Sequence, residues 1–360
     1  MIGILTFVGT QSHGAALQAY ALKRAIADLG YDVEIINYIS PEMKKTMESR
    51  LLTTNKGVKK LLGSVKRYPI VKKRYTLFEN FDKEYLGISS YADSIDYDKY
   101  ELIVVGSDQV WNMEITGNDL TYMLPENGRY IKGTYAASLG VDNFPEEYER
   151  KCIDLISRFS FLNVREKQLK DYLCGSIKDN DIRVVLDPTQ LLDRAAYDKI
   201  ETMSFDISGK YVLVHYPFDS DENWAMIRKI AAQRNAEVVY ITNKIKKQDG
   251  CRCLTAVSPR DYIGLIKNAE VVVTGSFHTL SFSLIYNKEF YCTRSMIANR
   301  NSRLTNLLET AGCEAQLLEN YPHEISYSKV NSLLDEQRKR SISILSEMCS
   351  KTKEDHKEEN

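Results

Sequence analysis

The sequence has no apolar run of the roughly 18 residues that a membrane-spanning helix needs. It also has no excess of one charge, since 48 Lys and Arg stand against 49 Asp and Glu, and this disfavours a general nucleic-acid binder. Cysteine is scarce, and seven residues at irregular spacing indicate free thiols in a reducing compartment. Cys251 and Cys253 form a C-x-C pair without a second Cys or His pair nearby to complete a metal site. We therefore expect a cytoplasmic protein that needs no metal and binds no nucleic acid.

Short β-branched runs alternate with helical patterns along most of the chain. The predicted strands are 2–8, 33–38, 102–105, 133–137, 161–164, 183–186, 211–215, 236–242 and 270–274, and the clearest predicted helices are 15–29, 146–158, 222–234, 259–268 and 277–287. The first strand starts at once, in MIGILTFVG, where a signal peptide would carry a basic region. This alternation predicts βαβ units with parallel sheets, and 360 residues suffice for two such domains.

We expect an α/β protein with two Rossmann-like domains that face a cleft. The predicted domains are 1–200, with a basic insertion at 44–74, and 201–325, with the boundary within 197–209. A helical stretch follows at 326–350, and the charged, apolar-poor tail 351–360 is predicted to be disordered. Facing domains of this kind bind ligands at the carboxyl ends of their strands.

The segment TGSFHTL predicts a buried strand that ends at Thr274 and a helix that follows it. Gly275 makes the turn, and Ser276 is the expected N-cap. His278 then lies in the first helical turn, beside the unpaired backbone N–H groups that bind anions. Two interpretations stay open on this spacing: an acid that acts on an anionic substrate, and a core histidine bonded to a backbone carbonyl.

The segment YELIVVGSDQVWN, residues 100–112, predicts a strand that opens into a polar turn. Asp108 is expected at the carboxyl edge of the sheet, where it could act as a base or bind a sugar hydroxyl. Gln109 and Asn112 supply amides close by, and the Trp111 indole could stack on a sugar ring. The structural alternatives are that Asp108 caps a helix and that Trp111 belongs to the core.

Two further groups of residues are weaker candidates. His13 lies in a predicted strand-to-helix turn, and Gln18 lies in the first turns of that helix, at a spacing that matches no phosphate-binding fingerprint. Arg165 ends a predicted strand, whereas Arg300 and Arg303 lie within ANRNSRLTNLL. Guanidinium groups suit carboxylate and phosphate, although most surface arginines are simply solvated.

Positive charge is concentrated in residues 44–74, which contain eleven Lys or Arg and one acid, Glu48. Apolar residues at helical spacing between the basic ones predict a short amphipathic helix. Such a helix indicates contact with an anionic membrane surface, which would place the protein at the inner face of the cell membrane. A solvated face on an ordinary helix is the alternative.

Taken in order, several segments resemble the polysaccharide pyruvyl transferase family. They are GAALQAYAL (14–22), VVGSDQVWN (104–112), YAASLG (135–140), VREK (164–167), VLDPTQLL (185–192), TGSFHTLSFSLIYNKEF (274–290) and RNSRLTNLL (300–308). Each match is weak alone, but the ordered set covers most of the chain. The resemblance implies a fold like that of GT-B glycosyltransferases, with a C-terminal helix that returns to the first domain.

The resemblance also implies roles for residues. His278 matches the histidine of the phosphoenolpyruvate site and becomes the expected general acid, with Asp108 as the base. The acceptor sugar is expected to contact the two N-terminal segments and the YAASLG segment, through His13, Gln18, Gln109, Trp111, Asn112 and Ser138.

The chain departs from the family pattern at two positions. Ser276 stands where some relatives have an arginine, and Thr279 where glycine is common. The resemblance therefore leaves Ser276 and one or more of Arg303, Arg300 and Arg165 to bind the pyruvyl donor.

The resulting expectation is transfer of pyruvate from phosphoenolpyruvate, a co-substrate rather than a cofactor, to two hydroxyls of one sugar. The acceptor would be a surface polysaccharide or its lipid-linked precursor, and the product a pyruvate ketal. Two alternatives stay open: a glycosyltransferase that uses nucleotide sugars, and a catalytically silent relative that binds glycans.

Overall fold

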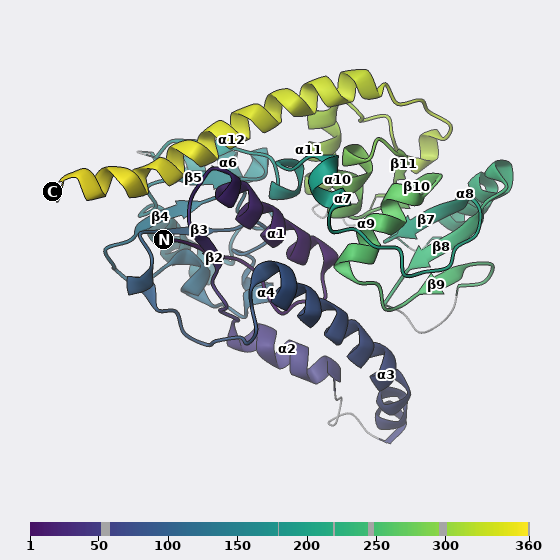
Figure 1. The fold of residues 1–360 in the computed structure, drawn as a ribbon, viewed down its shortest axis with the longest axis horizontal. Coiled ribbons are helices and arrows are strands. Elements are labelled where there is room, and N and C mark those ends of the chain that lie inside the picture. Colours follow the sequence, from purple (N-terminus) through teal and green to yellow (C-terminus); the bar gives the residue numbers. More distant parts are fainter. Residues whose placement is uncertain (52–57, 179, 219, 244–247, 295–300, 359–360) are drawn as a thin grey trace. The chain divides into compact units, whose positions relative to one another are not determined.

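Two parallel sheets form from the β-branched runs of the sequence, each in its own structural unit (Figure 1). The computed structural model describes residues 1–51, 58–178, 180–218, 220–243, 248–294 and 301–358, and side chains outside 50–67 and 353–358. The N-terminal unit comprises Met1–Leu51, Phe78–Leu191 and Glu336–Asn360, and the C-terminal unit comprises Leu52–Leu77 and Leu192–Asp335. The boundary therefore lies at Leu191 rather than near residue 200, because side chains of the N-terminal unit bind the turn that precedes it.

The sheet of the N-terminal unit has the order β2-β1-β3-β4, and all neighbours are parallel. Its strands are β1 (Ile2–Leu5), β2 (Val33–Ile35), β3 (Leu102–Val105) and β4 (Ile131–Thr134). A parallel pair, β5 (Leu162–Val164) and β6 (Ile182–Val184), lies beside β4. Single bridges join Gly133 of β4 to Phe161, and Ala137, after β4, to Val164. Because these strands are parallel, their carboxyl ends, and the loops that follow them, meet at one edge.

Helices and short helical turns connect these strands. They are α1 (His13–Asp28), α2 (Pro41–Leu51), η1 (Asp82–Leu86), η2 (Tyr97–Lys99), α4 (Met113–Thr116), η3 (Leu120–Met123), α5 (Glu146–Ile156), α6 (Lys167–Cys174) and η4 (Pro188–Gln190). Ser12 caps α1 by accepting a hydrogen bond from Ala15 N at 3.3 Å. Alanines fill the buried face of α1, so the helix packs closely against β2 and η4.

The C-terminal unit has a five-stranded parallel sheet in the order β11-β10-β7-β8-β9. Its strands are β7 (Tyr211–His215), β8 (Glu237–Ile241), β9 (Arg252–Leu254), β10 (Val271–Thr274) and β11 (Glu289–Cys292). Its other elements are α7 (Arg194–Asp198), α8 (Asp221–Arg234), α9 (Pro259–Asn268), α10 (Phe277–Ile285), α11 (Ser302–Ala311) and η6 (Leu318–Asn320). The central strands β7 and β10 are completely buried, as their continuous apolar sequences require.

Two long helices contain residues of both units. They are α3 (Val58–Phe81) and α12 (Tyr327–Glu358), whose residues from Glu336 onward belong to the N-terminal unit. The predicted return of a C-terminal helix is thus confirmed. The prediction of a disordered tail from residue 351 is wrong as far as Glu358, because α12 continues to that residue.

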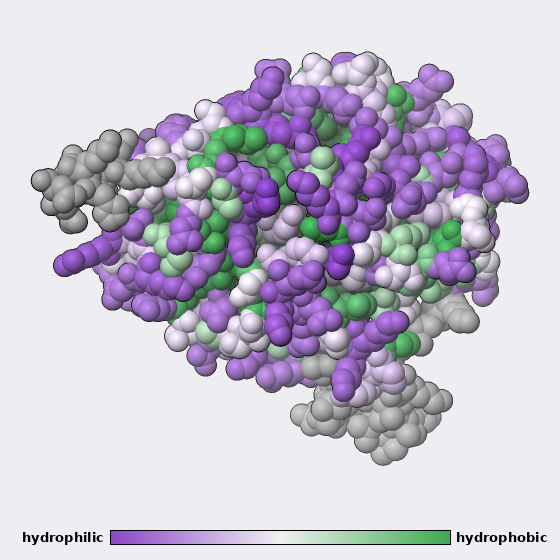
Figure 2. Space-filling view, viewed as in Figure 1, coloured by the Kyte–Doolittle hydropathy of each residue, from purple (hydrophilic) through white to green (hydrophobic). Residues whose placement is uncertain are grey.

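The visible surface is mainly hydrophilic and is interrupted by small hydrophobic areas (Figure 2). Within the described part of the chain, the large hydrophobic side chains that are exposed are Tyr68, Ile115, Val141 and Tyr216. In the same residues, no helix is long and apolar enough to cross a membrane.

Candidate functional site

A cluster of buried charges lies where the strands of the N-terminal unit end. Arg165, directly after β5, donates from Nε to Glu166 Oε1 and from Nη1 to Asp187 Oδ2, both at 2.9 Å. Its Nη2 lies 3.9 Å from Asp108 Oδ1. Burial acts to lower the pKa of Arg165, but the three carboxylates outweigh it and raise this pKa. The guanidinium therefore stays charged and holds three acids around it.

Hydroxyl groups complete this carboxylate cluster. Ser138 Oγ donates to Glu166 Oε1 at 2.9 Å, and Ser107 Oγ donates to Asp187 Oδ2 at 3.2 Å. Thr189 Oγ1 donates to the other oxygen of Asp187 at 2.7 Å. The segments VVGSDQVWN, YAASLG, VREK and VLDPTQLL thus meet in one network, although they are separate in the sequence.

The three acids differ in their access to solvent. The Asp108 side chain is 11% exposed, compared with 7% for Glu166 and 1% for Asp187. Asp108 also has the longest separation from Arg165, so its carboxylate is the one best placed to receive a proton from a ligand. Asp108 does not cap a helix, because Asn112 is the N-cap of α4.

A glycine is required two residues before this carboxylate. Gly106 has φ 114°, and a Cβ atom there would lie 2.4 Å from the Tyr135 carbonyl oxygen. The chain therefore passes close to the loop after β4, which brings Ser107 and Asp108 to the loop that carries Ser138.

Two residues that were predicted to contact the acceptor sugar, Gln18 and Trp111, are buried in the N-terminal unit. Gln18 is fully buried and donates to Thr6 Oγ1 at 2.8 Å, and Thr6 in turn donates to the Ser107 carbonyl. Gln18 thus supports the polypeptide before Asp108 instead of reaching a surface. Trp111 is also fully buried, and its indole N–H donates to the Tyr122 carbonyl at 3.0 Å. The expectation that Trp111 stacks on a sugar is therefore corrected, because its ring belongs to the core.

Of the other predicted residues of this unit, His13 and Gln109 are partly exposed, whereas Asn112 is buried. His13 begins α1, and its ring centroid lies 5.2 Å from that of Phe78. Gln109 follows Asp108 directly, and its Oε1 accepts a hydrogen bond from Asn112 Nδ2 at 3.2 Å.

In the C-terminal unit, β10 leads into α10 as the sequence predicts. The strand ends at Thr274, and Ser276 is the N-cap, with its Oγ accepting from Thr279 N at 3.4 Å. His278 is the second residue of α10 and is 8% exposed. Gly275 is needed at the turn, because a Cβ atom would lie 2.1 Å from the Phe218 ring.

A second histidine, which the sequence analysis missed, lies on the neighbouring strand. His215 ends β7 and pairs in register with Thr274. Its Nδ1 lies 2.7 Å from the hydroxyl oxygen Oγ1 of Thr279, and Thr279 directly follows His278 in the sequence. Tyr262 Oη lies at the same distance from this hydroxyl oxygen. The sequence did hold a signal, a titratable side chain at the carboxyl end of an apolar strand, as with Asp108. Tyr216, the next residue, is 54% exposed, so an aromatic ring is accessible here.

The predicted arginines have three different outcomes. Arg165 is bound by carboxylates that outnumber it, and its side chain is only 3% exposed, so it is not available to hold a pyruvyl donor. Arg303 is half-buried in the first turn of α11, a helix that packs against α10. Arg300 lies outside the described residues.

The sequence model of the family described as "Polysaccharide pyruvyl transferase" matches residues 13–295. No curated protein sequence matches the chain. Among solved structures, the UDP-GlcNAc 2-epimerase from Neisseria meningitidis bound to UDP-GlcNAc has a TM-score of 0.50 at 10% identity, and the match covers 98% of this chain and 99% of that one.

Two further solved structures are less similar in geometry. A putative UDP-N-acetylglucosamine 2-epimerase from Listeria monocytogenes has a TM-score of 0.49 at 12% identity, with 96% and 90% covered. The glycosyltransferase SsfS6 from Streptomyces sp. SF2575, complexed with thymidine diphosphate, has a TM-score of 0.43 at 11% identity, with 95% and 98% covered. The match to the Neisseria meningitidis epimerase, at 10% identity, shows the fold alone, and with the two parallel sheets it confirms the predicted α/β, GT-B-like class.

Proposed function

Because this chain belongs to the polysaccharide pyruvyl transferase family, we propose that it transfers the pyruvyl group of phosphoenolpyruvate to two hydroxyls of one sugar. The sugar is part of a surface polysaccharide or of its lipid-linked precursor. The product is a pyruvate ketal, and inorganic phosphate is released. The observation that carries this proposal is the carboxylate cluster around Arg165, where four separate segments place Asp108, the most exposed of the three carboxylates, at the sheet edge.

Asp108 acts on the acceptor in this proposal. A sugar hydroxyl adds to C2 of the enol, and its proton must leave as the O–C2 bond forms. Glu166 and Asp187 are occupied with Arg165, whereas Asp108 is farther from the guanidinium and more exposed. Arg165 is thus a positioning residue, which fixes Asp108 without binding substrate.

His278 acts on the pyruvyl donor. As the first hydroxyl adds to C2, the double bond takes a proton at C3 from the imidazole, and C3 becomes a methyl group. The bond from C2 to the phosphate oxygen then breaks, phosphate leaves, and the second hydroxyl forms the second O–C2 bond and loses its proton. The first N–H groups of α10 favour an anion at this place, which supports a phosphate or carboxylate beside His278.

The two negative groups of phosphoenolpyruvate need cations, because a buried charge without a partner is costly. Ser276 offers only a hydroxyl, which already caps α10. We assign Arg303 to the pyruvyl donor, since it lies in the first turn of α11, the helix that packs against α10. His215, held by Thr279, is a second candidate to contact the donor.

A lipid-linked acceptor would require the enzyme to work at a membrane surface. We propose that the basic segment 44–74 provides this contact at the inner face of the cell membrane. The structure describes much of its backbone as parts of the helices α2 and α3.

The test is a transfer assay with the full chain, phosphoenolpyruvate and a panel of free and lipid-linked glycans. We expect phosphate release together with a glycan mass increase equal to one pyruvic acid less one water. His278→Gln and Asp108→Asn should each lower turnover by about 10²- to 10⁴-fold without loss of fold. Asp142→Asn, an exposed acid of the N-terminal unit, is the matched control and should keep full activity.

A thermal-shift comparison separates this proposal from the glycosyltransferase alternative. Stabilisation by phosphoenolpyruvate is expected, because a ligand that binds only the folded state raises its apparent stability. Stabilisation by UDP-sugars alone, or near-normal turnover in both variants, would show that the proposal is wrong.

A further inference from the structure

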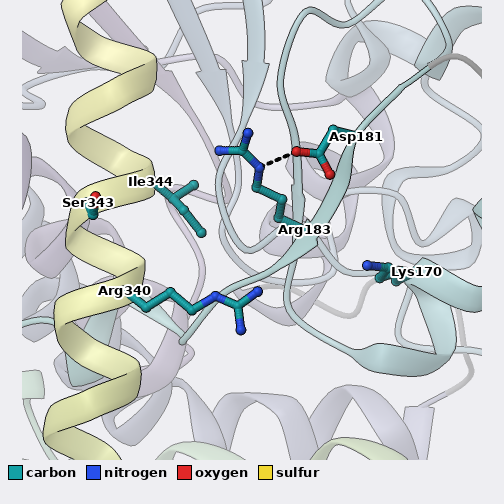
Figure 3. Close-up of a pocket in the computed structure, with 6 residues that line it drawn as sticks. All are labelled: Lys170, Asp181, Arg183, Arg340, Ser343 and Ile344. Carbon is teal, nitrogen blue, oxygen red and sulfur yellow. Dashed lines mark hydrogen bonds and ion pairs between the residues drawn. The ribbon is translucent and has the colours of Figure 1, made fainter.

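A hollow of about 390 Å³ lies in the N-terminal unit, apart from the carboxylate cluster (Figure 3). Three parts of the chain line it: α6 contributes Lys170, β6 and the residue before it contribute Arg183 and Asp181, and α12 contributes Arg340, Ser343 and Ile344. This volume falls within the range of small-molecule sites, roughly 300–1,000 Å³. None of the lining residues has a role in the proposed transfer reaction.

The charges around this hollow are unbalanced. Arg183 is fixed by acids, since its Nη1 donates to Glu347 Oε2 at 2.6 Å and its Nε donates to Asp181. Lys170 and Arg340 have no ion pair with any residue that the structure describes. Figure 3 shows their charged ends directed toward the space between them. Two positive charges that face the same space repel each other. An anion bound between them would attract both and offset this repulsion.

We propose that this hollow binds a phosphate-bearing sugar. Lys170 and Arg340 would bind the phosphate, and the Ser343 hydroxyl can donate to a third oxygen. Asp181 can accept hydrogen bonds from sugar hydroxyls, and Ile344 supplies an apolar wall for the face of the ring. The same chemistry is offered by a free sugar phosphate and by the phosphosugar of a lipid-linked glycan.

The bound sugar phosphate would strengthen the attachment of α12 to the N-terminal unit. Next to the lining residues, Ser341 Oγ accepts from Leu186 N at 3.0 Å, and Arg338 Nε donates to the Gln190 carbonyl at 2.7 Å. These two bonds hold both sides of the turn that contains Asp187. A ligand that joins Arg340 to Lys170 therefore stabilises the frame of the carboxylate cluster, without contact with it.

The experiment is calorimetric titration of glucose 1-phosphate into the full chain at low ionic strength. We expect saturable binding in the wild type and at least about tenfold weaker binding in Arg340→Gln and in Lys170→Gln, the usual effect of a lost charged contact. Lys339→Gln, an exposed lysine of the same helix outside the hollow, is the matched control and should bind within about twofold of the wild type. His278→Gln should also bind normally, which separates this site from the proposed transfer reaction.

Three results would overturn the proposal: no saturable binding in the wild type, equal affinity in the wild type and both hollow variants, or equal competition by chloride at the same ionic strength. The source of the phosphate is settled by sedimentation with vesicles that contain polyprenyl-phosphate-linked glucose. Recruitment that Arg340→Gln loses and Lys339→Gln keeps identifies the lipid-linked sugar. If these vesicles recruit neither the wild type nor Lys339→Gln, while glucose 1-phosphate still binds to both, the ligand is a free sugar phosphate.

Discussion

Removal of the Arg165 guanidinium should destabilise the N-terminal unit strongly. In Arg165→Met, Glu166 and Asp187 keep only neutral hydrogen-bond donors, while their side chains are 7% and 1% exposed. Breaking a buried ion pair by removing one partner costs about 3–5 kcal/mol. We expect a loss of this size in the free energy of unfolding at pH 7.5.

Tryptophan fluorescence can report this loss for one unit alone. The chain has two tryptophans, of which Trp111 lies in the core of the N-terminal unit and Trp224 in the core of the C-terminal unit. In a Trp224→Phe background, urea unfolding followed by fluorescence therefore measures the N-terminal unit. Arg158→Met is the matched control, since Arg158 pairs with Asp154 on the surface and its loss should cost at most about 0.5 kcal/mol.

The effect of pH distinguishes lost charge pairing from lost packing. Without Arg165, Glu166 and Asp187 bind protons more readily in the folded state than in the unfolded state. The stability of the variant relative to the wild type should therefore rise as the pH falls from 7.5 to 5. A loss below about 1 kcal/mol, or one of equal size at both pH values, would refute the role of Arg165 as the charge partner of this cluster.

Three further predictions concern other parts of the chain. Burial raises the pKa of Asp82 to about 6, and hydrogen bonds from Tyr91 and Gly9 only partly oppose this. Because the folded pKa exceeds the ordinary 3.8, the stability of the protein falls as the pH rises through about 6. Asp82→Asn should therefore stabilise the protein by up to about 3 kcal/mol at pH 8, and by less at pH 4.5, in the fluorescence assay. Equal gains in stability at both pH values would contradict this. Arg303→Lys keeps the charge but loses the planar fork, so the calorimetric affinity for phosphoenolpyruvate should fall about tenfold, and an unchanged affinity would place the pyruvyl donor elsewhere. The segment 44–74 should make the protein sediment with phosphatidylglycerol vesicles, less so as salt rises; equal sedimentation with neutral vesicles, or none, would exclude an electrostatic contact.

The sequence alone determined the class of fold and the local structure around His278. Strands such as β7 and β10 are continuous apolar runs, and the turn from Thr274 through Gly275 to Ser276 follows from glycine and capping chemistry. These signals act between residues close in the chain, so they can be read without the tertiary structure. The sequence did not predict the two strands β9 and β11. β9 is an edge strand of only three residues, Arg252–Leu254, and β11 follows α10 after a very short turn.

Only the tertiary structure decided which of the candidate residues lie together and which are buried. Ser107 and Asp187 are 80 residues apart, and Leu186 and Ser341 are 155 residues apart, yet each pair is hydrogen-bonded. No local pattern states that Arg165 is surrounded by carboxylates, because a charged residue at the end of a strand can equally face solvent. Burial and electrostatic pairing depend on all elements that pack around a side chain, and these contacts exist only once the sheets have formed.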